Sequence, residues 1–522
     1  MNDDVSPIVW VKDDAVGNPV LQLSSEDNVG VALRTLKAGE SFKAGESFSE
    51  ISIENAIPKG HKMALAPIAA GERVRKYAQT IGVARAPIAA GEHIHTHNLD
   101  FQNNDAAHEF CSDINELTIK STDTFQGFKR ADGRVGTRNF IAVLSSVNCS
   151  ATAVHHIVNS LSDEVLQAYP NVDGIAAFTH STGCGMATQG EGWDNLQRVL
   201  AGYATHPNIG GVLFVGLGCE ASQIQSTLSE HSLARGPLLC TMNIQTTGGH
   251  KKTVEQGHQH LLSMLPEVNR NSREACSASS LMLALQCGGS DAWSGITANP
   301  ALGYAADLLV KQGGTAVLAE TPEIYGAEHL LTRRAVSTAV AKHLMDRIDW
   351  WQDYVARNNG SLDNNPSPGN KLGGLTTILE KSLGAVAKGG TSPLTGVFKY
   401  AQPVDVNGFV FMDSPGYDPA SVTGQVAGGC NLVSFTTGRG STFGCKPAPS
   451  LKIATNTDMF EQLEDDMDIN AGTIVSNGDS VAEVGQQIYD RLLSVASGTK
   501  TLSEQHGLGD NEFVPWQVGA TM

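Results

Sequence analysis

Four cysteines stand at the ends of apolar, strand-like segments, each beside small polar residues or glycine. They are Cys149, Cys184, Cys219 and Cys287. In an open parallel α/β sheet, ligand sites form outside the carboxyl ends of the strands. Thiols from four such ends can therefore meet in one crevice although they are far apart in the sequence. Since thiolates favour soft metals and iron–sulfur clusters over magnesium, the pattern predicts a metal or catalytic centre.

The alternative for each cysteine is a small buried apolar residue, which is a common role of free cysteine. No C-x-x-C spacing links the four, so a zinc ribbon is not favoured. The chain has nine cysteines, and its N-terminus lacks the basic flank and apolar core of a secretion signal. We therefore expect reduced thiols in a cytoplasmic protein rather than a disulfide framework.

Two groups that can transfer protons lie next to these cysteines. His180 precedes Cys184 by four residues and can serve as a metal ligand or exchange a proton near neutral pH. Glu220 directly follows Cys219 and places a carboxylate beside a thiol. The alternatives are a hydrogen-bonded loop histidine and a glutamate that caps the following helix.

The segment that follows Cys287 is the densest in polar groups. Gly288 and Gly289 leave backbone N–H groups accessible, and Ser290 and Asp291 add donors and acceptors. Asp291 is a candidate catalytic residue and Ser290 a candidate substrate ligand. The alternative for Asp291 is the N-cap of the next helix.

Two cations in glycine-rich loops predict an anion site. Asn370 and Lys371 end a rigid, proline-containing loop, and Arg439 stands between two glycines after a strand-like run. Arginine binds a carboxylate through two parallel hydrogen bonds. We expect Arg439, Lys371 and Asn370 to bind substrate; a solvated surface arginine is the alternative for Arg439.

Composition excludes several classes of protein. The 522 residues are 41% hydrophobic and 17% charged, as in an ordinary globular enzyme, and the formal net charge of -18 disfavours a nucleic-acid partner. No apolar stretch approaches the ~20 residues of a membrane helix, so we expect no membrane partner. The sequence contains neither a Rossmann fingerprint nor a P-loop, and no G-x-S-x-G motif of serine hydrolases.

The elements that must position these residues form two kinds of domain. Short β-like runs with the near-repeats Ala66–Val74 and Ala86–Ile94 predict a small all-β module in the first hundred residues. From Gly127 onward, apolar runs alternate with helical patterns, which predicts α/β domains with parallel sheets. The expected boundaries are 1–102 for the β module, 103–126 for a linker, 127–270 for a first α/β domain, and 271–522 for a second α/β region that divides near 360–395.

Several of these segments resemble the altronate dehydratase and galactarate dehydratase family. The resemblance covers nearly the whole chain. It is densest in Asp132–Asn139, His180–Gly185, Gly216–Glu220, Gln286–Pro300, Asn365–Gly374 and Thr436–Gly440. The N-terminal part resembles the SAF-type (β-clip) module of that family.

The resemblance implies a hydro-lyase that removes water from a small anionic sugar acid to give a 2-keto-3-deoxy acid. It also implies iron as cofactor, either as Fe²⁺ or as an iron–sulfur cluster, with Mn²⁺ as a substitute. Ile324–Glu328 and His93–Asn98 are more similar to the altronate branch, and Met467–Thr473 to the galactarate branch. Altronate is the favoured substrate, and a homo-oligomer is compatible with the resemblance.

In the light of this resemblance, we expect Cys149, Cys184 and Cys287 to bind iron, with Cys219 as a fourth candidate. Three thiolates on a cluster would leave one iron open to the substrate's hydroxyl. The competing arrangement is a single Fe²⁺ held by His180 and carboxylates. His180, Glu220 and Asp291 are the candidate proton-transfer groups, and the histidines of the β module are expected near the site; these are His61, His93, His95 and His97.

Two other functions fit parts of the same pattern. One is elimination of sulfite from a sulfonated hydroxy acid such as sulfolactate, which shares the proton abstraction but has a different leaving group. The other is a sugar-acid-binding protein without catalysis. The density of thiols and charged groups in loops argues against the second.

Overall fold

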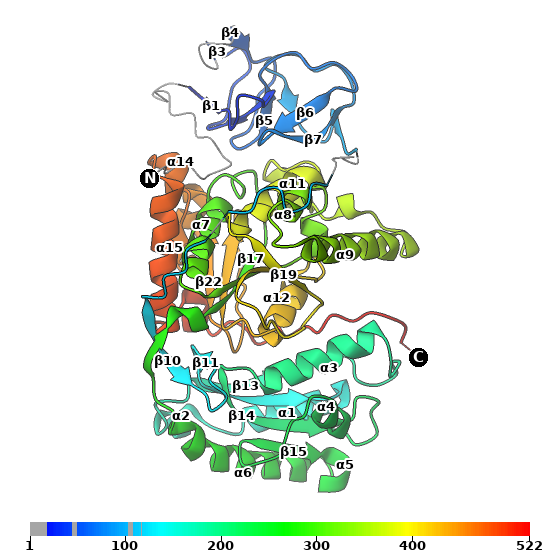
Figure 1. The fold of residues 1–522 in the computed structure, drawn as a ribbon, viewed down its shortest axis with the longest axis vertical. Coiled ribbons are helices and arrows are strands. Elements are labelled where there is room, and N and C mark those ends of the chain that lie inside the picture. The colour runs from blue at the N-terminus through cyan, green and yellow to red at the C-terminus, as the bar shows by residue number, and fades with distance from the viewer. Residues whose placement is uncertain (1–17, 44–49, 103–107, 116, 522) are drawn as a thin grey trace.

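The computed structural model describes residues 18–43, 50–102, 108–115 and 117–521. Three units follow one another along its long axis: an all-β module, a seven-stranded α/β domain and a smaller α/β domain (Figure 1). This confirms the expected fold class, a small β module followed by α/β domains with parallel sheets. Part of the expected linker, residues 103–107 and 116, lies outside the described residues.

The β module consists of small antiparallel sheets. One sheet has the strand order β1 (Val20–Leu21), β2 (Val29–Ala32), β5 (Lys62–Ala64), β8 (His93–Ile94). The others contain β6 (Arg73–Lys76), β7 (Gln79–Ala84) and β9 (Leu99–Asp100), and β3 (Ser41–Lys43) with β4 (Glu50–Ser52). The near-repeats pair with each other through a bridge between Ile68 and Ile88. Each repeat forms the same turn, in which Glu72 or Glu92 accepts the N–H of the alanine three residues earlier at 2.9 Å.

The smaller α/β domain has a four-stranded parallel sheet. Its strand order is β13 (Gly174–Phe178), β12 (Phe140–Ser145), β14 (Ile209–Gly216), β15 (Leu239–Asn243). Alternate residues face opposite sides, as a pleated strand requires. Ile141 and Val143 pack in the cluster that includes residues of α1 (Ala151–Val158) and α6 (His250–Asn269), whereas Ala142 and Leu144 pack with α3 (Glu191–Ala204).

The other helices of this domain are short. They are α2 (Asp163–Gln167), α4 (Ile224–Glu230) and α5 (Ile244–Thr247). The helical pattern after Cys149 is interrupted between α1 and α2, where the Ser160 hydroxyl donates to the carbonyl of Ile157 at 2.6 Å and satisfies it locally. A small antiparallel sheet of β10 (Thr124–Lys129), β11 (Val135–Gly136) and β16 (Glu274–Ser277) joins this domain to the larger one.

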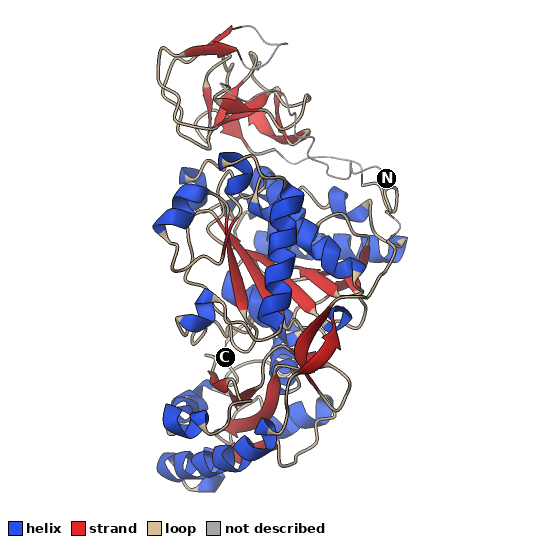
Figure 2. Ribbon diagram, turned by 90° about the vertical axis from the view of Figure 1, so that its left-hand side faces the viewer, coloured by secondary structure: helices blue, strands red, loops and turns tan. Residues whose placement is uncertain are grey.

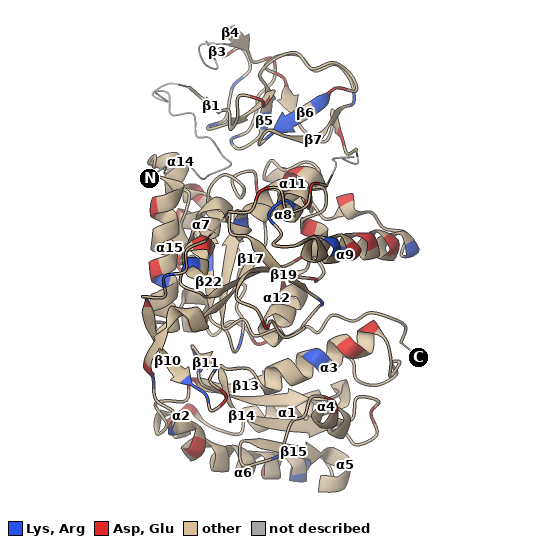
Figure 3. Cartoon of the chain, viewed as in Figure 1, with Lys and Arg blue, Asp and Glu red and all other residues tan. Residues whose placement is uncertain are grey.

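The larger α/β domain is built on a seven-stranded sheet in which every pairing is parallel. Its strand order is β19 (Leu394–Phe398), β20 (Gly408–Met412), β18 (Thr315–Leu318), β17 (Met282–Cys287), β21 (Leu432–Thr437), β22 (Ser450–Ala454), β23 (Ile469–Asn470). Strands β17, β18, β20 and β21 contain no charged residue, and in this domain the charged positions coloured in Figure 3 lie mostly on helices and loops. Such apolar strands are typical of a parallel sheet covered on both faces.

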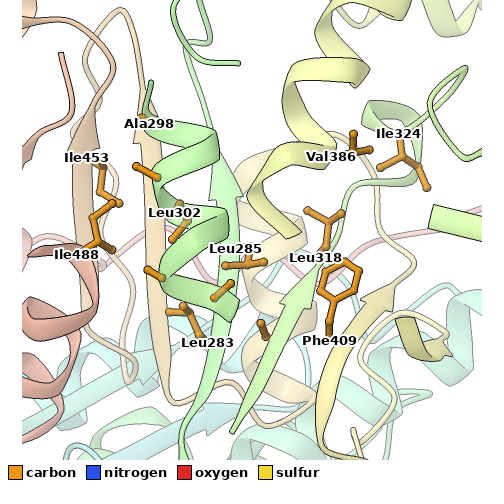
Figure 4. Close-up of a cluster of buried hydrophobic side chains, with 14 of the residues drawn as sticks. Leu283, Leu285, Ala298, Leu302, Leu318, Ile324, Val386, Phe409, Ile453 and Ile488 are labelled. Atoms are coloured by element: carbon orange, nitrogen blue, oxygen red, sulfur yellow. The ribbon is translucent and has the colours of Figure 1, made fainter. Parts of the chain in front are cut away.

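Helices cover both faces of this sheet (Figure 2). Leu283 and Leu285 of β17 pack against Leu302 of α7 (Ala298–Lys311), with Ile488 of α15 (Val481–Ala496) in the same cluster (Figure 4). Residues of α12 (Asp418–Ala427) pack with Ala284 and Val317 on the opposite face. The remaining helices are α8 (His329–Thr332), α9 (Thr338–Arg357), α10 (Pro368–Leu372), α11 (Ile378–Val386), α13 (Thr457–Gln462), α14 (Thr473–Ser476) and α16 (Leu502–Gln505). Among the described helices, none is both long and apolar enough to cross a membrane.

Candidate active site

A buried cluster of three potential metal ligands lies at the carboxyl edge of the seven-stranded sheet. Cys287 is the last residue of β17, Glu320 follows β18 by two residues, and Glu323 ends a short 3₁₀ turn, Thr321–Glu323. One ligand atom from each lies within 4.8 Å of the others, the only such set of three His, Cys, Asp or Glu side chains in the described part of the chain. This is the edge at which open parallel sheets bind their ligands.

Glu320 is the most unusual member of the cluster. Its side chain is 0% exposed, and within the described structure neither carboxylate oxygen has a hydrogen-bond partner. Burial raises its pKa well above the ordinary value. Its backbone φ of 73° lies in the left-handed region, which side chains other than glycine rarely adopt and which recurs at functional sites. Lys388 Nζ lies 3.8 Å from Oε2, which makes an ion pair without a hydrogen bond. Since a buried carboxylate without hydrogen bonds is costly, Glu320 is suited to receive a ligand such as a metal ion.

Two buried lysines contact the same cluster. Lys388 donates to the Cys287 sulfur at 2.9 Å, and Lys381 of α11 donates to Glu323 at 2.7 Å. Burial raises the pKa of the Cys287 thiol to about 12, whereas the neighbouring ammonium groups act in the opposite direction. Although burial disfavours its charged form, the anionic neighbours raise the pKa of Lys388 above the ordinary value. The two ammonium groups therefore provide fixed positive charge that a thiolate and two carboxylates can share.

A third carboxylate approaches from the start of α12. A Cβ atom added to Gly288 would collide with Asp418 Oδ2, so the glycine is required for this approach. Burial, followed by the charge of Glu323, raises the pKa of Asp418 to about 7. A carboxyl group that ionises near neutral pH is suited to general acid–base catalysis.

The polar residues predicted after Cys287 form hydrogen bonds that hold the loops at this carboxyl edge of the sheet. Asp291 is buried and accepts hydrogen bonds from the backbone N–H groups of Trp293 and Ser294 and from the Thr455 hydroxyl at 3.0–3.1 Å. Asn370 donates to the backbone carbonyl of Ser290 at 2.8 Å. Asp291 and Asn370 thus hold three loops together, and their catalytic and substrate-binding roles stay predictions.

The two predicted carboxylate-binding cations lie nearer the surface. Arg439 is exposed. Its Cβ atom lies beside Gly289: a Cβ atom added to that glycine would be 3.3 Å from it. Lys371 lines a hollow of about 430 Å³ together with His61, His95 and other residues of 366–372. Asn370 and Lys371 lie in helix α10 rather than in the expected loop, because Ser367 and Asn370 cap its first turn. Both cations are available to an anionic ligand at this end of the domain.

The β module covers this end of the larger domain. Lys62 and Lys76 donate to the carboxylate of Glu380 in α11 at 2.8 and 2.9 Å, and all three side chains are buried. The Thr377 hydroxyl of the same helix also bonds to the carbonyl of Ile81. The module is therefore anchored to the helix whose next residue, Lys381, contacts Glu323.

Two histidines of the module contact α10, and a third contacts one of them. The Nε2 atoms of His61 and His95 lie 3.3 and 2.9 Å from the carbonyl oxygens of Leu372 and Lys371, so both must carry a proton there. His61 Nδ1 then accepts from His93 Nε2 at 3.0 Å. Burial lowers the pKa of His61 to about 4 and that of His93 to about 3, so both rings are neutral at pH 7.

His180 and Glu220 lie in the smaller α/β domain, away from this cluster. His180 bonds to the carbonyl of Ser145 through Nε2 and accepts the Thr182 N–H through Nδ1, and burial lowers its pKa to about 4. Glu220 accepts hydrogen bonds from the Ser146 hydroxyl at 2.7 Å and the Gly218 N–H at 2.6 Å. Both side chains hold loops in place, and their predicted proton-transfer roles are untested.

The four cysteines stand at the ends of two sheets rather than one. Cys287 ends β17 of the seven-stranded sheet, whereas Cys149, Cys184 and Cys219 follow β12, β13 and β14 of the four-stranded sheet. Metal binding by each of them stays a prediction. The sequence interpretation missed Glu320, Glu323, Lys381, Lys388 and Asp418. Of these, Glu320 ends a strand-like run and could have been found by the rule that selected the cysteines.

Three protein-family models cover nearly all of the described chain. They describe an altronate/galactarate dehydratase SAF domain (residues 18–102), the second domain of D-galactarate dehydratase/altronate hydrolase (127–269), and a D-galactarate/altronate dehydratase C-terminal domain (278–521). An altronate dehydratase of Bacillus subtilis is 33% identical over 96% of this chain and 99% of the relative. The chain belongs to the galactarate/altronate dehydratase family.

Two further relatives show the breadth of the family. Galactarate dehydratase (L-threo-forming) of Escherichia coli is 36% identical over 94% of this chain and 95% of the relative. The beta subunit of (2R)-sulfolactate sulfo-lyase from Chromohalobacter salexigens is 30% identical over 75% of this chain and 96% of the relative. Membership therefore shows the architecture, and the leaving group must be argued from the site.

Proposed function

We propose that this protein is a metal-dependent hydro-lyase that removes water from a six-carbon sugar acid and forms a 2-keto-3-deoxy acid. The observation that carries the proposal is the buried Cys287–Glu320–Glu323 cluster, in which the Glu320 carboxylate has no hydrogen bond within the described structure. Two relatives that match nearly the whole chain are named as dehydratases of altronate and galactarate. The sulfo-lyase match leaves about a quarter of this chain uncovered and supports the alternative less well.

The chemistry requires a proton to leave the carbon beside a carboxylate, and negative charge then develops on the carboxylate oxygens. A divalent metal supplies Lewis acidity for this charge and for the departing hydroxyl. Cys287, Glu320 and Glu323 would hold it, and a mixed set of sulfur and oxygen donors suits iron better than magnesium. The absence of hydrogen bonds to Glu320 in the described structure fits this role.

The protein's own groups supply the other requirements. Lys388 and Lys381 keep Cys287 and Glu323 oriented, and fixed charges at a buried site stabilise an anionic transition state effectively. Asp418, with a pKa of about 7, is our candidate to take the proton. Arg439 and Lys371 are our candidates to bind the substrate carboxylate.

The proposal is tested with anaerobically purified protein loaded with Fe²⁺ and incubated separately with altronate, galactarate and sulfolactate. We expect 2-keto acid from altronate or galactarate and no sulfite from sulfolactate. Sulfite release in preference to dehydration would replace the proposal with the sulfo-lyase function. Tight binding of a sugar acid without product in any arm would replace it with the binding-protein function.

A further inference from the structure

The three exposed cysteines of the chain lie at one end of the four-stranded sheet. All nine cysteines fall within the described residues and are free thiols, and Cys149, Cys184 and Cys219 are the exposed ones. Free cysteine is among the most buried residue types, so exposure of three at a single sheet edge is unusual. The other six, including Cys287, are buried or partly buried.

The topology brings these three thiols to adjacent strand ends. Strand β12 lies between β13 and β14, and all three run parallel. Cys149 follows the end of β12 by four residues, Cys184 follows β13 by six, and Cys219 follows β14 by three. The thiols therefore leave neighbouring strands at the edge where parallel sheets bind ligands.

Hydrogen bonds join the three cysteine loops next to the thiols. The N–H of Asn148, which precedes Cys149, donates to the carbonyl of Thr182 at 2.9 Å. Ser222, in the loop of Cys219, donates to the carbonyl of Gly183 at 3.0 Å. Each of these hydrogen bonds joins two cysteine loops at positions no more than three residues from a cysteine. Glu220 adds hydrogen bonds to Ser146 and Gly218, which hold the Cys149 and Cys219 loops together.

We propose that Cys149, Cys184 and Cys219 ligate an iron–sulfur cluster that is separate from the Cys287 site. A single tetrahedral ion with metal–sulfur bonds near 2.3 Å needs sulfurs about 3.8 Å apart. Among the described residues, these three sulfurs are not a set within 4.8 Å of one another. A cluster distributes its thiolates over several irons and accepts a wider spacing.

The surrounding groups support a site with three protein ligands. His180 and Glu220 use their hydrogen-bonding atoms within the loops, so the thiols remain as the available ligands. Gln245 donates through Nε2 to the Cys219 sulfur at 3.3 Å, the kind of bond that tunes thiolate ligands of clusters. A four-iron cluster on three thiolates keeps one iron without a protein ligand, open to an oxygen ligand from solution.

The test uses the full-length protein, reconstituted anaerobically with Fe²⁺, sulfide and a thiol reductant. We expect iron and acid-labile sulfide bound together, with a visible absorbance band. Cys149→Ser, Cys184→Ser and Cys219→Ser should each lower cluster content by about tenfold or more, because loss of a ligand should cost at least as much as loss of a supporting group. Because the side chains are exposed, the serine variants should keep the wild-type melting temperature when both are compared before reconstitution.

Two matched variants separate this site from other thiols and from the proposed dehydratase centre. Cys240→Ser, on β15 of the same sheet, and Cys287→Ser should both retain the cluster. Wild-type protein that binds no sulfide, or a triple Cys149/Cys184/Cys219 serine variant that keeps the cluster, would overturn the proposal. Binding of one zinc ion by the three thiolates without sulfide would also overturn it.

Discussion

The contact between the β module and the larger domain depends on Glu380, and its removal should weaken that contact strongly. The carboxylate accepts hydrogen bonds from Lys62, Lys76 and both the N–H and hydroxyl of Thr376 at 2.7–3.0 Å. Glu380→Ala leaves two ammonium groups buried beside a cavity. Loss of one partner from a buried ion pair typically costs about 3–5 kcal/mol, and we expect that range here.

The same interface supplies a matched control. Lys59 of the module lies 2.5 Å from Asp458 of the larger domain, but these side chains are 41% and 71% exposed. Asp458→Ala should therefore change the free energy of unfolding by about 1 kcal/mol or less. Urea denaturation gives both free energies, and hydrogen exchange of the module reports whether it detaches first. Equal stabilities of the two variants, or wild-type exchange in Glu380→Ala, would refute the reasoning.

Three other perturbations test individual contacts. Docking of the module should weaken in acid. Burial alone would raise the pKa of Glu380, but the charges of Lys62 and Lys76 outweigh it and lower the pKa from 4.5 to about 2. The stability that the Glu380 carboxylate contributes is therefore present above pH 4.5 and is lost as the pH falls toward 2. A Glu380→Gln variant, which cannot titrate, should lack this part of the pH dependence in denaturation curves, and an unchanged slope would count against the assignment. Gly288→Ala should destabilise the fold by about 1–3 kcal/mol, because the added methyl group collides with Asp418 and Phe435. Gly236→Ala is the control: its methyl group meets open space, and the free energy of unfolding should change by about 0.5 kcal/mol or less. Equal melting temperatures for these glycine variants would contradict the packing at Gly288. Lys388→Met removes the ammonium group beside Cys287 and should weaken Fe²⁺ binding by about 10–100-fold. Lys342→Met, on the exposed side of α9, should leave the affinity unchanged. Isothermal titration with Fe²⁺ measures both affinities.

The sequence predicted the architecture well because its signals are local. Repeated Gly-Glu turns mark the β module, and apolar runs that end in small polar residues mark the parallel strands. The same strand-end rule located Cys287 and the exposed trio Cys149, Cys184 and Cys219. It could not assign them to two sheets, because a strand's own residues do not specify which strands it pairs with.

Most of the buried cluster could not be predicted, for a physical reason. Lys381 and Lys388 lie in or directly after α11, a short helix that mixes charged and apolar residues with no sign of a site, and periodicity there suggests only a packed or solvated face. Their function depends on the facing loops that carry Cys287 and Glu323, which are about 60–100 residues away in sequence. Asp291 and His180 were predicted as proton-transfer groups, and in the folded chain their polar atoms also bond to neighbouring loops. Their catalytic roles stay predictions.

The central claim is that the Cys287–Glu320–Glu323 cluster holds the metal that dehydration requires. The most direct measurement is the Fe²⁺-binding isotherm of wild type and Glu320→Gln, recorded alongside 2-keto acid formation from altronate and galactarate. Because Glu320 has no hydrogen bonds to lose within the described structure, the variant should keep its fold. We predict that metal affinity and turnover both fall by at least about tenfold at unchanged melting temperature. Unchanged affinity with wild-type turnover would contradict the account.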